Sequence, residues 1–297
     1  MEQLKHIFGP MRLPFLILTP ACVLLGVSSA YWTAGSINLP DLFLLLSAGI
    51  LAHISVNTFN EYFDFKSGLD FRTTKTPFNG GSGTLIEQPH QAIFVLTIAW
   101  ISIILTALIG FYFISAKGFS LLPIGLTGLI LIYSYTKWIT KHPYLCLIAP
   151  GTGFGIIMVI GSHFALTAEY SISSFYISLV PFFLVNNLLL LNQFPDLEAD
   201  RTVGRRHFPI AYGKKASAVV YGIFLILTYL VIILGVWFKH MPNYCLLGLT
   251  TAIFMIPVYF KIQKHADEAN QILKSLPFNV LNTILTPILV SIGLIIG

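Results

Sequence analysis

Nine long apolar stretches dominate this 297-residue chain and decide the solvent in which it folds. A bilayer core about 30 Å thick is crossed by roughly 20 apolar residues in an α-helix. Stretches of about that length cover residues 13–33, 40–62, 91–115, 119–138, 143–166, 172–193, 216–238, 243–262 and 276–296. Hydrophobic residues make up 56% of the chain and charged residues only 10%. The sequence therefore predicts a protein that crosses the membrane many times.

The apolar stretches are continuous and do not alternate with polar residues. Leu188–Leu191 and Ile223–Leu227, for example, contain no polar position. Membrane-spanning β-strands would instead appear as segments of about ten residues with strict alternation. We therefore predict an all-α, polytopic membrane protein, with nine transmembrane helices in a single domain over residues 1–297.

The basic residues indicate the orientation, because Lys and Arg accumulate in cytoplasmic loops. With the N-terminus in the cytoplasm, all seventeen except Lys117 and Lys239 fall on the cytoplasmic side. This asymmetry supports both the number of helices and their parity. We predict a multi-pass protein of the cell inner membrane, surrounded by the lipid bilayer. No basic and aromatic pattern indicates a nucleic-acid partner.

Two acidic clusters, at the cytoplasmic ends of the second and sixth apolar stretches, hold half of the twelve carboxylates. Asn60 and Asp64 stand four residues apart in the first, and Asn192, Asp196 and Asp200 repeat that step in the second. Steps of four place side chains on one face of a helix. Solvated helix ends would explain a single cluster. The matched pair favours a functional site, because ionisable groups at membrane depth are costly.

The chemistry of the two clusters indicates a metal site. Oxygen ligands without His or Cys suit Mg²⁺, which takes one or two carboxylates and leaves other positions to water and substrate phosphates. Two facing clusters could hold Mg²⁺ around a diphosphate and stabilise the charge on that leaving group. Departure of the diphosphate from a prenyl diphosphate would leave an allylic cation. A dry, aromatic-lined bundle would protect that cation from water. The predicted catalytic residues, which are also predicted metal ligands, are Asn60, Asp64, Asp196 and Asp200.

Basic side chains in the loops 66–90 and 201–215 are candidates for contacts to phosphate oxygens. The positive-inside bias alone would also place basic residues there. The candidates are Lys66, Arg72, Lys75, Arg201, Arg205 and Arg206. From them, and from the second cluster, the predicted diphosphate contacts are Lys66, Arg72, Lys75, Arg201 and Asn192. His53, two turns before Asn60, is left out, because a lone His in a helix more often packs or forms a structural hydrogen bond.

The two clusters resemble the motifs of the UbiA superfamily of intramembrane prenyltransferases. That family is known for nine transmembrane helices, with Asn-Asp-x-x-Asp-x-x-x-Asp after helix 2 and Asp-x-x-x-Asp after helix 6. Asn60, Glu61 and Asp64 match the first motif, and Asp196 and Asp200 match the second. The resemblance implies a Mg²⁺-bound diphosphate between the motifs and an isoprenoid tail in a lateral, lipid-facing tunnel.

The first motif departs from the family pattern at two positions. Glu61 stands where Asp is usual, and Gly68 occupies the position of the last Asp. Asp70, two residues later, is expected to serve as the missing metal ligand. The glycine-rich string 80–83 is expected to close over the substrate, since glycine lets backbone N–H groups approach an anion.

The strings 66–70 and 76–83 resemble the branch typified by 1,4-dihydroxy-2-naphthoate polyprenyltransferases of menaquinone synthesis. Phe154 stands where that branch usually has an acidic residue, and Pro195 precedes Asp196 where Arg is usual. The resemblance implies Mg²⁺-dependent transfer of a polyprenyl group from its diphosphate to an aromatic acceptor, 1,4-dihydroxy-2-naphthoate first. Alternative acceptors are 4-hydroxybenzoate, a glycerol-phosphate lipid and a porphyrin. A transporter is the alternative from another class, although transporters usually place such groups near the bilayer midplane.

Overall fold

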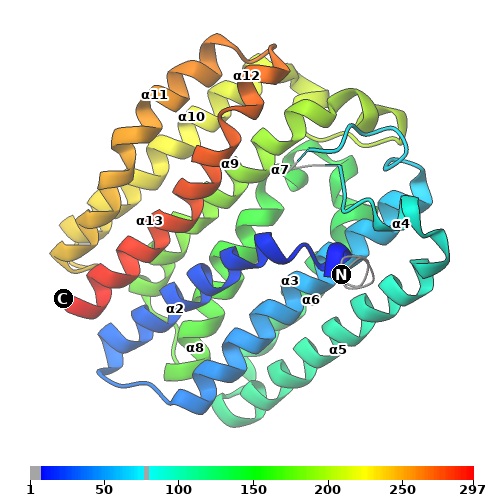
Figure 1. Cartoon of the computed structure of the whole chain (residues 1–297). Helices are drawn as coiled ribbons and strands as arrows, with labels where there is room; N and C mark the ends of the chain where they lie inside the picture. The colour runs from blue at the N-terminus through cyan, green and yellow to red at the C-terminus, as the bar shows by residue number, and fades with distance from the viewer. Residues whose placement is uncertain (1–7, 77–79) are drawn as a thin grey trace.

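The computed structural model describes residues 8–76 and 80–297 and places them in a bundle of helices (Figure 1). Within these residues there is no strand, and nine helices are long and apolar enough to cross a membrane. These spans are Gly9–Ala34, Leu39–Ser67, Pro89–Lys117, Phe119–Lys137, Pro143–Thr167, Ile172–Thr202, Phe208–Trp237, Asn243–Lys264 and Ala269–Ile296. The prediction of an all-α fold with nine spans is confirmed.

Several spans contain more than one helical element. The main elements are α2 (Leu18–Ala34), α3 (Leu39–Ser67), α4 (Thr84–Glu87), α5 (Ala92–Lys117), α6 (Leu122–Lys137), α7 (Pro143–Gly151), the π-helix η6 (Thr152–Ile160), α8 (Gly161–Thr167), α9 (Ile172–Thr202), α10 (Phe208–Trp237), η7 (Asn243–Thr251), α11 (Ala252–Lys264), α12 (Ala269–Leu273) and α13 (Leu276–Ile296). Two short 3₁₀ turns, η1 (Gly9–Met11) and η2 (Leu13–Ile17), precede α2. The fifth span therefore passes from α-helix to π-helix and back.

Helices α3 and α9 extend beyond the apolar stretches 40–62 and 172–193 that predict them. α3 ends at Ser67, and its cap Gly68 has a left-handed φ of 78° that suits glycine. α9 continues through Pro195 to Thr202. The added turns are polar, so the apolar pattern ends these helices too early. Asp64, Asp196 and Asp200 lie on the added turns.

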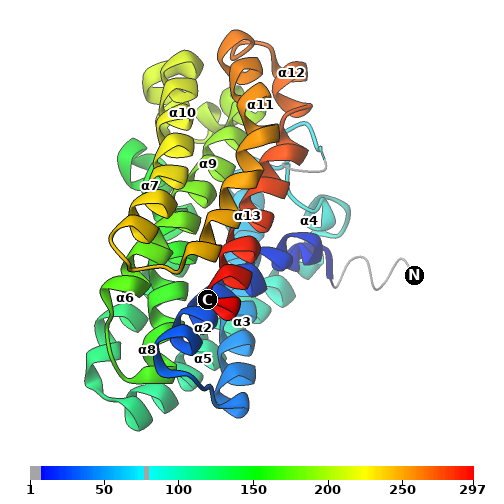
Figure 2. The same cartoon turned by 90° about the vertical axis from the view of Figure 1, so that its left-hand side faces the viewer.

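The bundle has two groups of helices with α2 between them. α9 packs against α10, α13 and α7, while α3 packs against α5 and α6. α2 contacts both α13 and α3. Figures 1 and 2 show α9 to α13 gathered on one side and α3, α5 and α6 on the other.

Small residues allow the close approach of α7 and η6 to α9. A Cβ on Gly151 would lie 2.1 Å from the carbonyl oxygen of Phe182, and one on Gly155 would lie 2.5 Å from its backbone nitrogen. Neither distance is sterically possible, so only glycine fits at these two positions. Such contacts are typical of helix pairs in membranes, where packing replaces the hydrophobic effect as the driving force.

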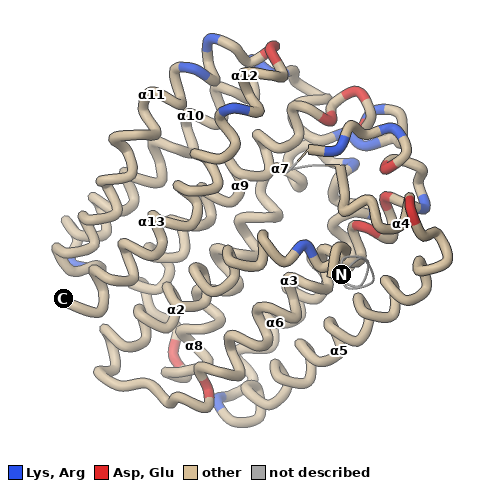
Figure 3. The backbone as a smooth tube through the Cα atoms, viewed as in Figure 1, with Lys and Arg blue, Asp and Glu red and all other residues tan. Residues whose placement is uncertain are grey.

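Charged side chains gather at one end of the bundle. Figure 3 shows most Lys, Arg, Asp and Glu residues around α4, α7 and α12, at the ends of α3 and α9. The opposite end carries few, among them Asp41 and Lys117, whose charged groups lie 3.3 Å apart. The charged end is the one that the sequence predicts to face the cytoplasm.

Candidate functional site

A cavity of about 590 Å³ runs between the two helix groups and reaches the charged end. Polar side chains line it at the charged end, which we call its mouth, and its deeper walls, from residues such as Leu45, Ile114 and Leu121, are apolar. The predicted ligands and Asn192 all line this cavity, namely Asn60, Asp64, Asp70, Asn192, Asp196 and Asp200. The structure therefore brings together side chains from α3, α9 and the loop after α3. We call the oxygen side chains at the end of α3 (Asn60, Asp64) the first ladder and those of α9 (Asn192, Asp196, Asp200) the second ladder.

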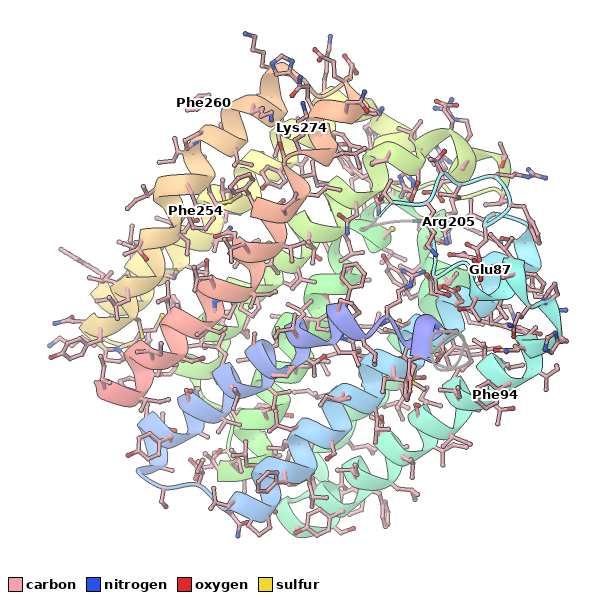
Figure 4. The ribbon with its side chains drawn as sticks, in the orientation of Figure 1. Glu87, Phe94, Arg205, Phe254, Phe260 and Lys274 are labelled. Atoms are coloured by element: carbon pink, nitrogen blue, oxygen red, sulfur yellow. The ribbon has the colours of Figure 1, made fainter. Side chains whose placement is uncertain are left out.

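Arg205 joins the two ladders at the mouth of the cavity. Its Nη1 donates to Asp200 Oδ1 at 2.8 Å, and its Nη2 donates to Asp64 Oδ1. Figure 4 places Arg205 at the charged end, beside the loop that follows α3. Burial lowers the pKa of Arg205, but the charges of Asp64 and Asp200 outweigh that effect and raise it above its ordinary value. The guanidinium is therefore a fixed positive charge between two carboxylates.

Arg12 is the second basic side chain that lines the cavity. It lies between η1 and η2, and its Nη2 donates to Asn60 Oδ1 at 3.0 Å. The same nitrogen lies 3.4 Å from Glu61 Oε2. The start of the first span is thus bound to the first ladder by a charge-assisted contact.

Glu61 anchors the glycine-rich loop and does not line the cavity. Its buried carboxylate accepts the backbone N–H of Ser82 at 3.0 and 3.1 Å and also the Ser82 hydroxyl. Gly80, Gly81 and Gly83 have positive φ angles of 83°, 68° and 79°, which explains the requirement for glycine there. The string 77–79 of this loop lies outside the described residues.

Asp70 is buried beside the first ladder and lines the cavity. Burial raises the pKa of Asp70 to about 7, with further increases from the charges of Asp64 and Glu61. The positive charges of Arg12 and Arg205 oppose this increase. A carboxyl group with this pKa releases its proton to water near neutral pH, so an arriving cation can displace that proton and bind the carboxylate.

His207 holds Asp200 from the side opposite Arg205. Its Nε2 lies 2.9 Å from Asp200 Oδ2, and the ring is buried. Farther along the second ladder, the side-chain oxygen of Asn192 is buried and has no hydrogen-bond partner among the described residues. An unpaired buried oxygen is costly, which fits a ligand that supplies a positive charge or a donor.

The donor set at the mouth suits Mg²⁺, because it consists of carboxylate and amide oxygens. In the described part of the chain, no three His, Cys, Asp or Glu side chains are close enough together to hold a metal ion. Arg205 binds both ladders in this arrangement. A metal therefore requires amide or substrate oxygens in addition to the carboxylates, or a movement of Arg205.

The other predicted diphosphate contacts are exposed and do not line the cavity. Arg72 Nη1 lies 3.5 Å from the carbonyl oxygen of Thr202 and so connects the two loops. Arg201 pairs with the exposed Glu198 at 3.5 Å. Lys66 lies over the ring of Tyr62, 5.8 Å from its centre, and Lys75 donates to the carbonyl of Ser82.

Two Arg residues line the cavity, and neither is among the predicted diphosphate contacts. Arg205 is one of the six basic candidates, but the prediction selects Arg201 from the same loop. Arg12 has no local signal, because it is 48 residues away from Asn60 along the chain. Only the packing of the first span against α3 brings the two together.

Residues 19–282 of this chain match the model of the UbiA prenyltransferase family. The 1,4-dihydroxy-2-naphthoate octaprenyltransferase of Bacillus subtilis (strain 168) is 29% identical over 201 residues. That match covers 67% of this chain and 63% of the Bacillus protein, so slightly less than two thirds of the relative is matched.

Solved structures with the same fold include two UbiA homologues. The apo structure of the homologue from Aeropyrum pernix K1 has a TM-score of 0.70 at 17% identity, covering 95% of this chain and 97% of the other. The homologue from Archaeoglobus fulgidus bound to DMAPP and Mg²⁺ has a TM-score of 0.66 at 15% identity, covering 95% and 98%. Since the family model covers most of its length, this chain belongs to the UbiA prenyltransferase family.

Proposed function

We propose that this protein transfers a prenyl group from a prenyl diphosphate to an aromatic acceptor, with Mg²⁺ as the cofactor. The observation that carries the proposal is the convergence of two oxygen-rich ladders at the polar mouth of one otherwise apolar cavity. The homologue from Archaeoglobus fulgidus, which shares the fold, was solved with DMAPP, a prenyl diphosphate, and Mg²⁺. The cavity offers polar side chains for the diphosphate of such a substrate and apolar walls for its prenyl chain.

The metal would be held by the five predicted ligands, Asn60, Asp64, Asp70, Asp196 and Asp200. When bound, Mg²⁺ supplies positive charge that neutralises diphosphate oxygens and favours departure of that group. The side chains that hold it come from three segments, so binding would also fasten α3, α9 and the loop after α3 to one another.

Arg205 and Arg12 provide the fixed positive charge at the same place. Arg205 donates to Asp64 and Asp200. Its fork of N–H groups can equally donate to phosphate oxygens, which resemble carboxylates in geometry. Asn192 lines the cavity beside them, and the exposed Lys66, Arg72, Lys75 and Arg201 would reach the diphosphate only if the loops close over it.

The apolar part of the cavity would hold the prenyl chain and exclude water. Aromatic side chains from several spans line it, including Phe15, Phe113, Tyr135 and Phe154. Ring faces stabilise a nearby positive charge, and a dry site prevents water from capturing an allylic cation.

The proposed acceptor is 1,4-dihydroxy-2-naphthoate, in menaquinone biosynthesis. Support comes from the strings shared with that branch and from the match to the Bacillus octaprenyltransferase, whose name carries this substrate. We further propose that the protein lies in the inner membrane with the ladders facing the cytoplasm, because Lys and Arg gather at that end (Figure 3).

The test is prenyl transfer by the purified protein in lipid nanodiscs. A labelled prenyl diphosphate is offered with four acceptors in turn: 1,4-dihydroxy-2-naphthoate, 4-hydroxybenzoate, a glycerol phosphate and a porphyrin. We expect prenylated naphthoate product that disappears in EDTA and in Asp64→Asn. Product with another acceptor would replace the naphthoate assignment. Uptake of substrate into proteoliposomes without any transfer would contradict the enzyme and favour a transporter.

A further inference from the structure

Two buried histidines bind α2 in the same way but face different surroundings. His53 of α3 has Nδ1 2.8 Å from Thr19 Oγ1, and His163 of α8 has Nδ1 3.0 Å from Ser29 Oγ. Their exposed fractions are 6% and 1%. His53 lines the cavity that holds the ladders, whereas His163 does not. Only one of two otherwise similar residues can therefore contact a ligand in that cavity.

The ring of His53 is fixed on two sides, which leaves one nitrogen for a ligand. Thr19 binds Nδ1, and Phe154 of η6 packs edge-on against the ring with centroids 4.8 Å apart. Nε2 has no hydrogen bond to any described residue. Because His53 lines the cavity, this nitrogen can form a hydrogen bond with a polar group of a molecule bound there.

His53 lies at the depth where an acceptor must bind. His53, Asn57, Asn60 and Asp64 all line the cavity from one face of α3. At 1.5 Å per residue, His53 is about 10 Å from Asn60 along the helix axis, toward the apolar end. The reacting carbon of a prenyl diphosphate is directly bonded to the diphosphate, so an acceptor ring must lie just beyond the first ladder. The interval between Asn60 and His53 meets this requirement, because both residues line the cavity.

Asn57 lies within this interval, and one of its groups already has a partner. Its Nδ2 donates to the carbonyl oxygen of Met11 at 3.0 Å and so holds the start of the first span. The neighbouring wall positions Gly49, Ala52 and Val56 are apolar. On this face of α3, the Nε2 of His53 is therefore the polar group that lies deepest among apolar neighbours.

We propose that His53 Nε2 forms a hydrogen bond with a ring hydroxyl of the aromatic acceptor and thereby positions the ring for attack. This assignment rests on the proposed function, because it presumes a hydroxylated aromatic substrate. His53 is then an acceptor-binding residue, and Thr19 and Phe154 keep its imidazole in place.

Two substitutions of His53 distinguish the roles of its two ring nitrogens. His53→Gln places an amide where Nε2 lies, and His53→Asn places one where Nδ1 lies. We expect His53→Asn to raise the KM for the acceptor about tenfold, the effect of one lost hydrogen bond. The KM for prenyl diphosphate should stay within about twofold. His53→Gln should restore most of the acceptor affinity, and the matched control His163→Asn should leave both KM values unchanged.

A modified acceptor shows whether the effect is a direct contact. Replacement of the bound hydroxyl by hydrogen, which removes both its donor and its acceptor, should raise the KM for the wild type about as much as His53→Asn does, and it should have little further effect in that variant. Equal KM increases for both substrates, or additive effects of hydroxyl removal and substitution, would overturn the proposal. Thermal unfolding of each variant identifies any that is misfolded, and His53→Gln then carries the test. If the wild type transfers no prenyl group to any aromatic acceptor, the proposed function itself fails.

Discussion

The ends of α3 and α9 carry similar oxygen ladders, but different parts of the chain hold them. Arg12 and Ser82 bind Asn60 and Glu61 at the end of α3, across 48 and 21 residues of sequence. Asp200 at the end of α9 is bound by Arg205 and His207, which follow it within seven residues. Asp200, at the end of the second ladder, is thus held by nearby residues, whereas the end of α3 is held by distant segments.

This difference indicates that the end of α9 is fixed, whereas the end of α3 can respond to movement of the loop that follows it. A ladder held by its own turn is in place once α9 and that turn have formed. A ladder held by the first span and a glycine-rich loop can change when the loop moves, and Glu61 couples it to that loop. Arg205 is the direct connection between the two, because it binds Asp64 and Asp200 together.

The largest expected effect tests whether the two ladders are equally necessary. Asp64→Asn and Asp200→Asn should each lower kcat by roughly 10²–10³-fold, the size expected when one charge-stabilising group is lost. Both variants should keep the helical circular dichroism spectrum of the wild type. Near-normal turnover in either one would show that a single ladder suffices.

Substitution of Arg205 provides the next test, because Arg205 binds both Asp64 of α3 and Asp200 of α9. Arg205→Ala leaves Asp64 and Asp200 buried without their cation, and breaking such a pair costs about 3–5 kcal/mol. We expect a lower thermal unfolding midpoint and a higher KM for prenyl diphosphate. The exposed neighbour Arg206 is the matched control, and Arg206→Ala should change neither quantity. Equal effects of both substitutions would contradict the bridging role.

The pH dependence of Mg²⁺ binding tests Asp70, which lies beside the first ladder and has no counterpart beside the second. The raised pKa of Asp70, about 7, means that this carboxyl is protonated below pH 7 and must lose its proton to bind a cation. Apparent Mg²⁺ affinity should therefore fall up to about tenfold from pH 8 to pH 6. Asp70→Asn should bind Mg²⁺ more weakly and show a smaller pH dependence. An unchanged pH dependence in that variant would assign the proton to another group.

The smallest effect on catalysis is expected from substitution of Arg201, on the surface near the end of α9. Arg201 is exposed and pairs with the exposed Glu198, an interaction worth at most about 1 kcal/mol. Arg201→Ala should alter kcat/KM by less than about threefold. A much larger loss would show that the loop closes and brings Arg201 to the diphosphate.

The sequence predicts the spans well because lipid imposes a length and a composition on every helix. It places the ends of α3 and α9 too early, since their last turns are polar and the apolar pattern stops before them. Helix periodicity beyond the apolar stretch recovers the ladders, because steps of four continue through Asp64 and Asp200. The sequence does not predict the residues that bind the ladders. Arg12 contacts Asn60 only because separate spans pack together, and no local pattern indicates this contact.

The central claim is that both ladders bind one Mg²⁺-diphosphate unit. The most direct measurement is equilibrium binding of an unreactive prenyl diphosphate analogue to the protein in nanodiscs, with and without Mg²⁺. We predict binding that requires Mg²⁺ and is lost in Asp64→Asn and in Asp200→Asn alike. Binding that is independent of Mg²⁺, or that is lost in only one of the two variants, would contradict the account.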